Sequence, residues 1–296
     1  MRHDWHGREL LKAKMQGPIS ISGLHEIVDH FDVFFVDQFG VLHDGQKPYA
    51  GVVDAIEKLH QFGKQLIILT NSGKRAEPNL KRLLEMGFSK HTLHTVVSSG
   101  EVAWRGIESA NFGFPFASDS KVYIIGRHSD DYRFHDLGLH FVERPEIANF
   151  ILILGSNAPI TSLEEYQELL GQAANVGVPA LCANPDIWMI SGGGLVPAPG
   201  AIAETYKKLG GPVRHIGKPY RDIYQSALAF SSTQTKQRVI AIGDSIEHDI
   251  RGANDFAISS VLVRGGVSAS LTTDELNQKY SDDGAWPNYV IPAFQW

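Results

Sequence analysis

The sequence of 296 residues is poor in cysteine, in basic charge and in long apolar runs. Its single cysteine, Cys182, cannot form an internal disulfide, and we expect it to be a small buried apolar residue. Lysine and arginine number 27 against 33 aspartates and glutamates, and this net charge of −6 argues against binding to nucleic acid or to an anionic membrane. Apolar runs such as residues 150–154 are far shorter than the roughly 20 residues that span a bilayer, so we expect no transmembrane helix.

The N-terminal segment lacks the apolar stretch of about 7 to 15 residues that a secretory signal requires. Its first fifteen residues, MRHDWHGRELLKAKM, carry charged side chains instead, and we assign them no function. Together with the single cysteine, this segment predicts a cytoplasmic protein. The composition as a whole, with 43% hydrophobic and 20% charged residues, is typical of folded globular proteins.

The order of apolar segments predicts an α/β protein with a doubly wound, Rossmann-like, mostly parallel core sheet and an inserted α/β domain. Short apolar runs that alternate with amphipathic segments indicate βαβ units, which form parallel sheets. We expect a discontinuous core of residues 1–98 and 195–296, with residues 99–194 as the insertion. The predicted strands are residues 30–36, 65–69, 95–98, 122–125, 150–154, 239–242 and 260–263, and the predicted helices are residues 52–62, 77–86, 163–174, 201–209 and 222–230.

Polar side chains follow three of the apolar strands. Asp37 follows FFV, Thr70 follows LIIL, and Asp244 follows VIAIG, with Asp249 five residues further on. Because ligands of parallel sheets bind beyond the carboxyl ends of the strands, we expect these side chains to share a site, with Lys218 as a nearby cation. A carboxylate nucleophile, a hydroxyl group, a lysine and a divalent cation held by carboxylates suit phosphoryl transfer. The oxygen ligands favour Mg²⁺, since no cluster of cysteine and histidine offers a zinc site.

Four segments carry a family resemblance. In this order, DQFGVLHDG, LTNSG, GKPYRDIY and GDSIEHDIRGA resemble the four motifs of the haloacid dehalogenase superfamily of phosphatases. The insertion before the third segment, which includes ANPD, resembles the large cap domain of subfamily IIA, a group that includes sugar-phosphate, p-nitrophenyl phosphate and pyridoxal phosphate phosphatases. The resemblance covers nearly the whole chain from Phe31 onward. It implies a catalytic core with an active site that an α/β cap closes.

The resemblance also implies roles for individual residues. Asp37 would be the nucleophile, Thr70 would hydrogen-bond the transferring phosphoryl group, and Lys218 would balance the charge on phosphate and carboxylate. The implied metal ligands are Asp37, the backbone carbonyl of Phe39, Asp244 and Asp249. The implied substrate-binding residues are Asn71, Ser72, Asn184 and Asp186. Structural roles compete with some of these assignments, because Thr70 also suits a helix N-cap and Asp249 suits the first turn of a helix.

One position departs from the phosphatase pattern. The residue two after the nucleophile is usually a second aspartate, which protonates the leaving group and then activates water, and here it is Phe39. A phenyl ring cannot move a proton, and general acid/base catalysis typically contributes about 10² to 10⁴ in rate. His43, Asp44 and a residue of the cap are the candidates for a substitute.

The sequence therefore predicts an HAD-type phosphatase that hydrolyses a small phosphate monoester, with a sugar phosphate as the example that the resemblance suggests. It would depend on Mg²⁺ and act through an aspartyl phosphate on Asp37. The alternative is a catalytically weak protein that binds or senses a phosphorylated metabolite, because Phe39 replaces the usual acid/base group. We expect no nucleic-acid or membrane partner, and the resemblance suggests a homodimer through the cap.

Overall fold

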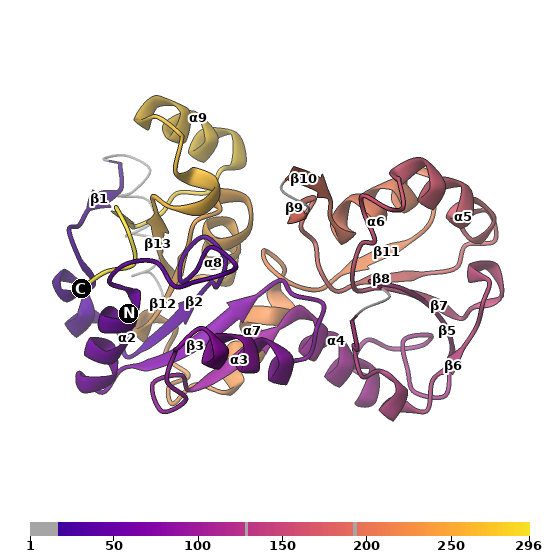
Figure 1. Ribbon diagram of the computed structural model, residues 1–296, viewed down its shortest axis with the longest axis horizontal. Coiled ribbons are helices and arrows are strands. Elements are labelled where there is room, and N and C mark those ends of the chain that lie inside the picture. Colours follow the sequence, from indigo (N-terminus) through magenta and orange to yellow (C-terminus); the bar gives the residue numbers. More distant parts are fainter. Residues whose placement is uncertain (1–16, 128–129, 192–193) are drawn as a thin grey trace, which may run out of the picture. The chain divides into compact units, whose positions relative to one another are not determined.

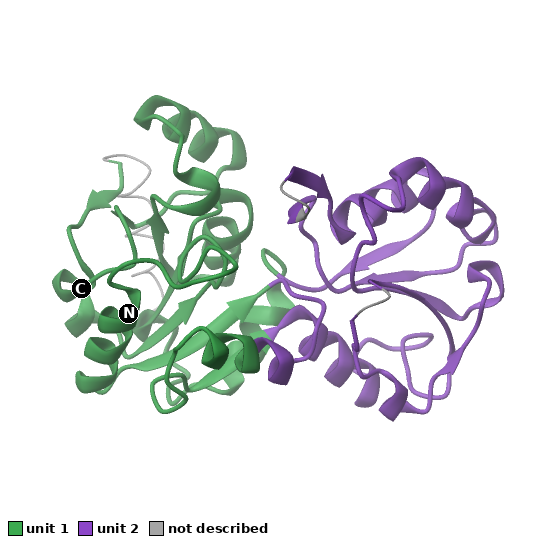
Figure 2. Cartoon of the chain, in the orientation of Figure 1, with its two compact units in different colours: residues 1–70, 80–97, 218–296 green, residues 71–79, 98–217 purple. Residues whose placement is uncertain are grey.

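The computed structural model describes residues 17–127, 130–191 and 194–296, and the chain forms two compact units (Figure 2). The first unit comprises the chain up to residue 70 together with residues 80–97 and 218–296, and the second comprises residues 71–79 and 98–217. The N-terminal fifteen residues, to which the sequence assigns no function, lie outside the described residues. Among the described helices, none combines the length and the apolar character that crossing a membrane requires.

The first unit is built on a seven-stranded sheet with the strand order β1-β14-β13-β12-β2-β3-β4. Neighbouring strands from β1 through to β3 run parallel. The chain passes from β2 to β3 and β4 on one side, and its later strands β12, β13 and β14 extend the sheet on the other side (Figure 1). The order therefore reverses between β2 and β12, and such a switch point is where open parallel sheets bind ligands. The strands are β1 (Ile19–Ser20), β2 (Val33–Val36), β3 (Gln65–Thr70), β4 (Thr95–Ser98), β12 (Val239–Gly243), β13 (Ser259–Val263) and β14 (Tyr289–Ile291).

Apolar side chains stabilise this sheet and the helices around it. Every residue of β2, β12 and β13 is buried, as expected for central strands of a parallel sheet that is covered on both faces. Helix α2 (Val52–Gln61) buries Val52, Ala55, Ile56 and Leu59, whose spacing of three and four residues forms one apolar stripe. The described residues of this unit also form α7 (Arg221–Ala229), α8 (Arg251–Phe256), α9 (Thr273–Asp283) and the second half of α3 (Ala76–Glu85), with short 3₁₀ helices at Leu24–Glu26, Val28–His30, Lys236–Arg238 and Gly266–Ser268 and a π-helical turn at Ile246–Ile250.

The second unit has its own five-stranded parallel sheet, in the order β11-β8-β7-β5-β6. Helix α5 (Leu163–Asn175) begins with a capping box, in which Ser162 and Glu165 bond each other's backbone amides. Its buried side chains pack with those of α6 (Pro199–Lys208) into one apolar core, to which Cys182 belongs as expected. The remaining elements are α4 (Ser99–Glu108), β5 (Lys121–Ile125), β6 (His140–Phe141), β7 (Phe150–Ile153), β8 (Ala180–Cys182), β11 (Val213–His215), the antiparallel pair β9 (Trp188–Ser191) and β10 (Gly194–Pro197), and 3₁₀ helices at His135–Leu137 and Pro145–Ile147.

The predicted fold class, a mostly parallel Rossmann-like α/β sheet with an inserted α/β unit, is confirmed. The unit boundaries differ from the expected ones at two places. Residues 195–217, expected in the core, belong to the second unit because β11 pairs with β8 there. Residues 71–79 also belong to the second unit, so that helix α3 (Ala76–Glu85) begins in one unit and ends in the other.

Candidate active site

Three carboxylates meet beyond the carboxyl ends of two neighbouring strands. Asp37 follows β2, and Asp244 follows β12, which is the parallel neighbour of β2 at the switch point. Asp249 lies one turn further on, in the π-helical turn. One ligand oxygen from each of the three carboxylates lies within 4.8 Å of the others, and Asp244 and Asp249 are buried. The structure therefore brings together the three side chains that were predicted to hold a metal ion.

Lys218 joins this carboxylate cluster from the segment that precedes α7. Its Nζ lies 2.7 Å from Oδ1 of Asp37 and 2.7 Å from Oδ1 of Asp249, and its side chain is only 4% exposed. The other oxygen of Asp249 accepts a hydrogen bond of 3.1 Å from the Ser245 amide, and Oδ2 of Asp244 accepts one of 2.7 Å from the Val267 amide. Backbone amides and one lysine thus hold the carboxylates in fixed positions.

Burial and mutual repulsion shift the pKa values in this cluster. Burial raises the pKa of Asp37 to about 6, although Lys218 opposes the shift. Burial, with repulsion from Asp37 and Asp249, raises the pKa of Asp244 to about 8. Burial lowers the pKa of Lys218, but the carboxylates of Asp249 and Asp37 outweigh burial and hold it above its ordinary value. One lysine does not neutralise three carboxylates, so the cluster favours additional positive charge.

Two glycines make room for the carboxylates. A Cβ atom at Gly243 would overlap the Cγ of Asp249, and one at Gly266 would overlap Oδ2 of Asp244. Gly266 also has a φ of +46°, a conformation that side-chain-bearing residues rarely adopt. Because Gly243 immediately precedes Asp244, the sequence itself could have indicated its importance. Nothing in the sequence around Gly266 connects that glycine with the site.

Thr70 and Phe39 lie near the same edge of the sheet. Thr70 is the last residue of β3, the parallel neighbour of β2, and it is buried. Phe39 lies in the segment after β2, and its side chain is 44% exposed. The next residue, Gly40, packs so closely that a Cβ there would overlap Oδ2 of Asp244. The segment that carries Phe39 therefore lies directly against the carboxylate cluster.

The predicted substrate-binding residues form a group within the second unit. Asn71 Nδ2 donates a hydrogen bond of 2.7 Å to Oδ1 of Asp186, and the Asp186 amide donates one of 3.1 Å to Oδ1 of Asn184. Ser72 has a local role, since its Oγ accepts a hydrogen bond of 3.3 Å from the Lys74 amide. The structure thus connects Asn71, from the second predicted motif, with the ANPD segment.

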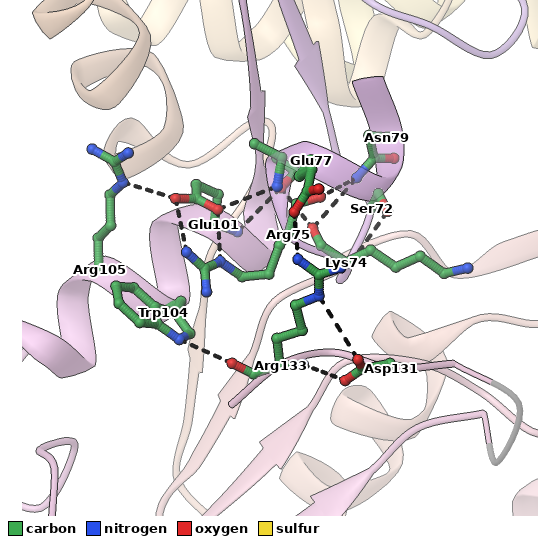
Figure 3. Close-up of polar contacts among 12 residues, drawn as sticks. Ser72, Lys74, Arg75, Glu77, Asn79, Glu101, Trp104, Arg105, Asp131 and Arg133 are labelled. Atoms are coloured by element: carbon green, nitrogen blue, oxygen red, sulfur yellow. Dashed lines mark hydrogen bonds and ion pairs between the residues drawn. The ribbon is translucent and has the colours of Figure 1, made fainter. Parts of the chain in front are cut away.

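The segment that contains Asn71 and Ser72 is anchored to α4 by charged residues that the sequence did not indicate (Figure 3). Arg75 Nε donates a hydrogen bond of 2.6 Å to Glu101, and its guanidinium carbon lies 3.8 Å from the ring centroid of Trp104. Glu101 also accepts hydrogen bonds from Arg105 Nε at 2.9 Å and from the Ala76 amide at 3.2 Å. Although burial raises the pKa of Glu101, hydrogen bonds from Arg75 and Arg105 bring it down to about 2.

Comparisons with known proteins identify the family of the chain. Residues 34–140 match a family model described as haloacid dehalogenase-like hydrolase, and residues 215–295 match one described as HAD-hydrolase-like. A 4-nitrophenylphosphatase of Schizosaccharomyces pombe is 26% identical over 289 residues, which cover 90% of this chain and 93% of that protein. A haloacid dehalogenase-like hydrolase from Brucella suis 1330 has a TM-score of 0.78 and 26% identity, over 92% of this chain and 99% of that one. A p-nitrophenyl phosphatase from Archaeoglobus fulgidus has a TM-score of 0.69 and 25% identity, over 89% and 97% of the two chains.

Proposed function

This chain belongs to the haloacid dehalogenase superfamily and is a phosphoric monoester hydrolase, and we propose that it cleaves small phosphate esters through an aspartyl phosphate on Asp37. The observation that carries the proposal is the cluster of Asp37, Asp244, Asp249 and Lys218 at the switch point of the sheet, in which all but the partly exposed Asp37 are buried. A carboxylate can attack phosphorus when nearby positive charge offsets the charge on the phosphate. Lys218, 2.7 Å from Asp37, supplies such charge at the attacking group.

The carboxylates of this cluster fit Mg²⁺. They present oxygen ligands within 4.8 Å of one another, and Mg²⁺ prefers oxygen ligands and keeps several waters. Three carboxylates surround one lysine, so negative charge is in excess. Burial raises the pKa of Asp244, and repulsion from Asp37 and Asp249 adds to the shift. We therefore propose Asp37, Asp244, Asp249 and the backbone carbonyl of Phe39 as the ligands. The metal, when bound, would neutralise charge on the phosphate.

The other predicted residues complete the proposal. Thr70, at the end of β3, would donate a hydrogen bond to a phosphate oxygen. Asn71, Ser72, Asn184 and Asp186 would contact the substrate from the second unit, which would serve as the cap. The hydrogen bond between Asn71 and Asp186 supports this grouping, because it unites the second motif with the ANPD segment. A sugar phosphate as substrate, a homodimer through the cap and a cytoplasmic location stay predictions.

Phosphate release from a panel of substrates tests the proposal. The panel contains sugar phosphates, nucleotides, pyridoxal phosphate and p-nitrophenyl phosphate, each with Mg²⁺ and with chelator. We expect metal-dependent release by the wild type and at least about a 10³-fold loss in Asp37→Asn, because the nucleophile is removed. Asp54→Asn, the same chemical change on the exposed face of α2, is the matched control and should retain activity. Wild-type activity in Asp37→Asn would show that the nucleophile is another residue.

A second candidate function follows from Phe39. If the folded wild type releases phosphate from none of these substrates, a protein that binds phosphorylated metabolites becomes the better explanation. Such a ligand would raise the melting temperature without turnover, because a ligand that binds only the folded state stabilises it.

A further inference from the structure

We propose that this active site selects its substrates by the leaving group, and that it cleaves aryl, enol and acyl phosphates much faster than phosphates of ordinary alkyl alcohols. The proposal rests on the proposed function, in which Asp37 attacks phosphorus. Its structural basis is the loop of residues 38–49, which follows Asp37. It places alkyl phosphates, including sugar phosphates esterified at a primary alcohol, among the poorer substrates.

Phe39 presents an apolar surface beside the carboxylate cluster. Its ring packs edge-on against His43, with the ring centroids 6.1 Å apart, and a Cβ at Gly45 would lie 3.0 Å from its Cε2. The ring is therefore held by the turn at residues 43–45 and is still 44% exposed. Since the next residue, Gly40, packs against Asp244, the segment that carries this exposed ring borders the carboxylate cluster.

The imidazole of His43 and the carboxylate of Asp44, the two substitutes that the sequence offers within this loop, hydrogen-bond the backbone of their own turn. His43 is only 2% exposed, its Nδ1 accepts a hydrogen bond of 3.1 Å from the Gly45 amide, and its Nε2 is buried with no hydrogen-bond partner among the described residues. Oδ1 of Asp44 accepts hydrogen bonds from the amides of Gln46 and Lys47, at 2.8 and 2.9 Å. Both side chains thus hold the backbone of their own turn. Within this loop, neither is placed to donate a proton to a substrate.

In this proposal neither His43 nor Asp44 of the described loop protonates the leaving group, and the consequence falls on the first step of the reaction. An Asp37 oxygen forms a bond to phosphorus while the bond from phosphorus to the leaving oxygen breaks, and the electron pair stays on that oxygen. Without a donor the leaving group departs as an anion, which aryloxides, enolates and carboxylates delocalise and alkoxides do not. In the second step a water oxygen attacks phosphorus, the bond to Asp37 breaks, and the water proton passes to bulk solvent. This step is the same for every substrate, so only the first depends on the leaving group.

A series of substituted phenyl phosphates and one alkyl phosphate of similar size tests the proposal. We expect kcat/KM of the wild type to fall at least about tenfold for each two units by which the leaving-group pKa rises. In Phe39→Asp we expect about a 10²-fold gain for the alkyl phosphate and little change for the most acidic phenol. Phe39→Asn is the matched control, because asparagine has nearly the shape of aspartate but cannot act as a general acid. It should show no such gain.

Other outcomes would overturn the proposal. If the wild type is active but its kcat/KM does not depend on the leaving-group pKa, it already has a proton donor and the proposal is wrong. This result refutes the proposal even if Phe39→Asp fails to fold. Tyr49, 37% exposed at the end of the loop, is tested directly, since a steeper dependence in Tyr49→Phe would identify it as the donor and refute the proposal. If the wild type cleaves none of the esters, or Asp37→Asn cleaves them equally well, the proposed function itself has failed.

Discussion

Glu101 provides a sharp test of how the second unit is stabilised. Its carboxylate binds Arg75, Arg105 and the Ala76 amide, and its side chain is 10% exposed. A pKa of about 2 in place of the ordinary 4.5 corresponds to about 3 to 4 kcal/mol of stabilisation, at roughly 1.4 kcal/mol per pH unit. Glu101→Gln removes the charge, keeps the size and leaves Arg75 without a carboxylate. We expect it to lower the free energy of unfolding by about 3 kcal/mol at pH 7.

Urea unfolding followed by tryptophan fluorescence measures this change, because Trp104 stacks on Arg75. Since folding lowers the pKa of Glu101, its contribution is fully present above pH 4.5 and is lost as the pH falls towards about 2. The difference between wild type and Glu101→Gln should therefore shrink at pH 3.5. Glu168→Gln, an exposed position on α5, is the matched control and should change stability by less than about 0.5 kcal/mol. Equal stability of the two variants at pH 7, or a difference that does not shrink in acid, would refute the reasoning.

Two further predictions concern the carboxylate cluster. Folding raises the pKa of Asp244 from 3.8 to about 8, so the folded state favours the protonated carboxyl. The contribution of Asp244 to the free energy of unfolding is therefore lost as the pH rises from about 4 to about 8. Asp244→Asn should therefore stabilise the chelator-treated protein at pH 8 by about 1 to 3 kcal/mol in urea unfolding while abolishing metal-dependent phosphate release, and a destabilised variant would count against this account. Gly243→Ala should displace Asp249, lowering stability by about 1 to 3 kcal/mol and kcat/KM by at least about tenfold, whereas Gly171→Ala, with no neighbour in the way, should do neither. Normal activity in Gly243→Ala would show that Asp249 can move without consequence.

The sequence predicts the central elements of the fold well because their burial is continuous. The strands at residues 95–98 and 150–154 and the helix at 163–174 match β4, β7 and α5 to within one residue. The predicted strand at residues 30–36 is too long, since residues 28–30 form a 3₁₀ helix before β2. Helix α4 escaped prediction because its sequence, SGEVAWRGIE, contains two glycines and begins directly after a strand. The two-residue strands β1 and β6 have too few residues to show a period.

The superfamily predicted from four motifs is confirmed, whereas the roles of single residues stay predictions. Asp37 and Asp244 follow neighbouring parallel strands that end at the same edge of the sheet, and Asp249 lies in the turn after Asp244. The motifs therefore predict that these three carboxylates meet, and Lys218 joins them. The role of Glu101 could not be predicted in this way. Its partner Arg75 lies 26 positions away, and a pairing across that distance leaves no periodic pattern in the sequence.

The place of β2 in the sheet has a consequence for synthesis of the chain. Its neighbour β12 begins at Val239, and translation at about 5 to 20 residues per second needs roughly 10 to 40 s to reach that strand after Val36. During this interval the apolar VFFV strand has one unpaired edge, which is a template for aggregation. Most of the second unit, in contrast, is encoded without interruption between residues 98 and 217. On the ribosome, the inserted unit can therefore fold before the sheet that carries Asp37, whose β2 edge stays unpaired until β12 emerges.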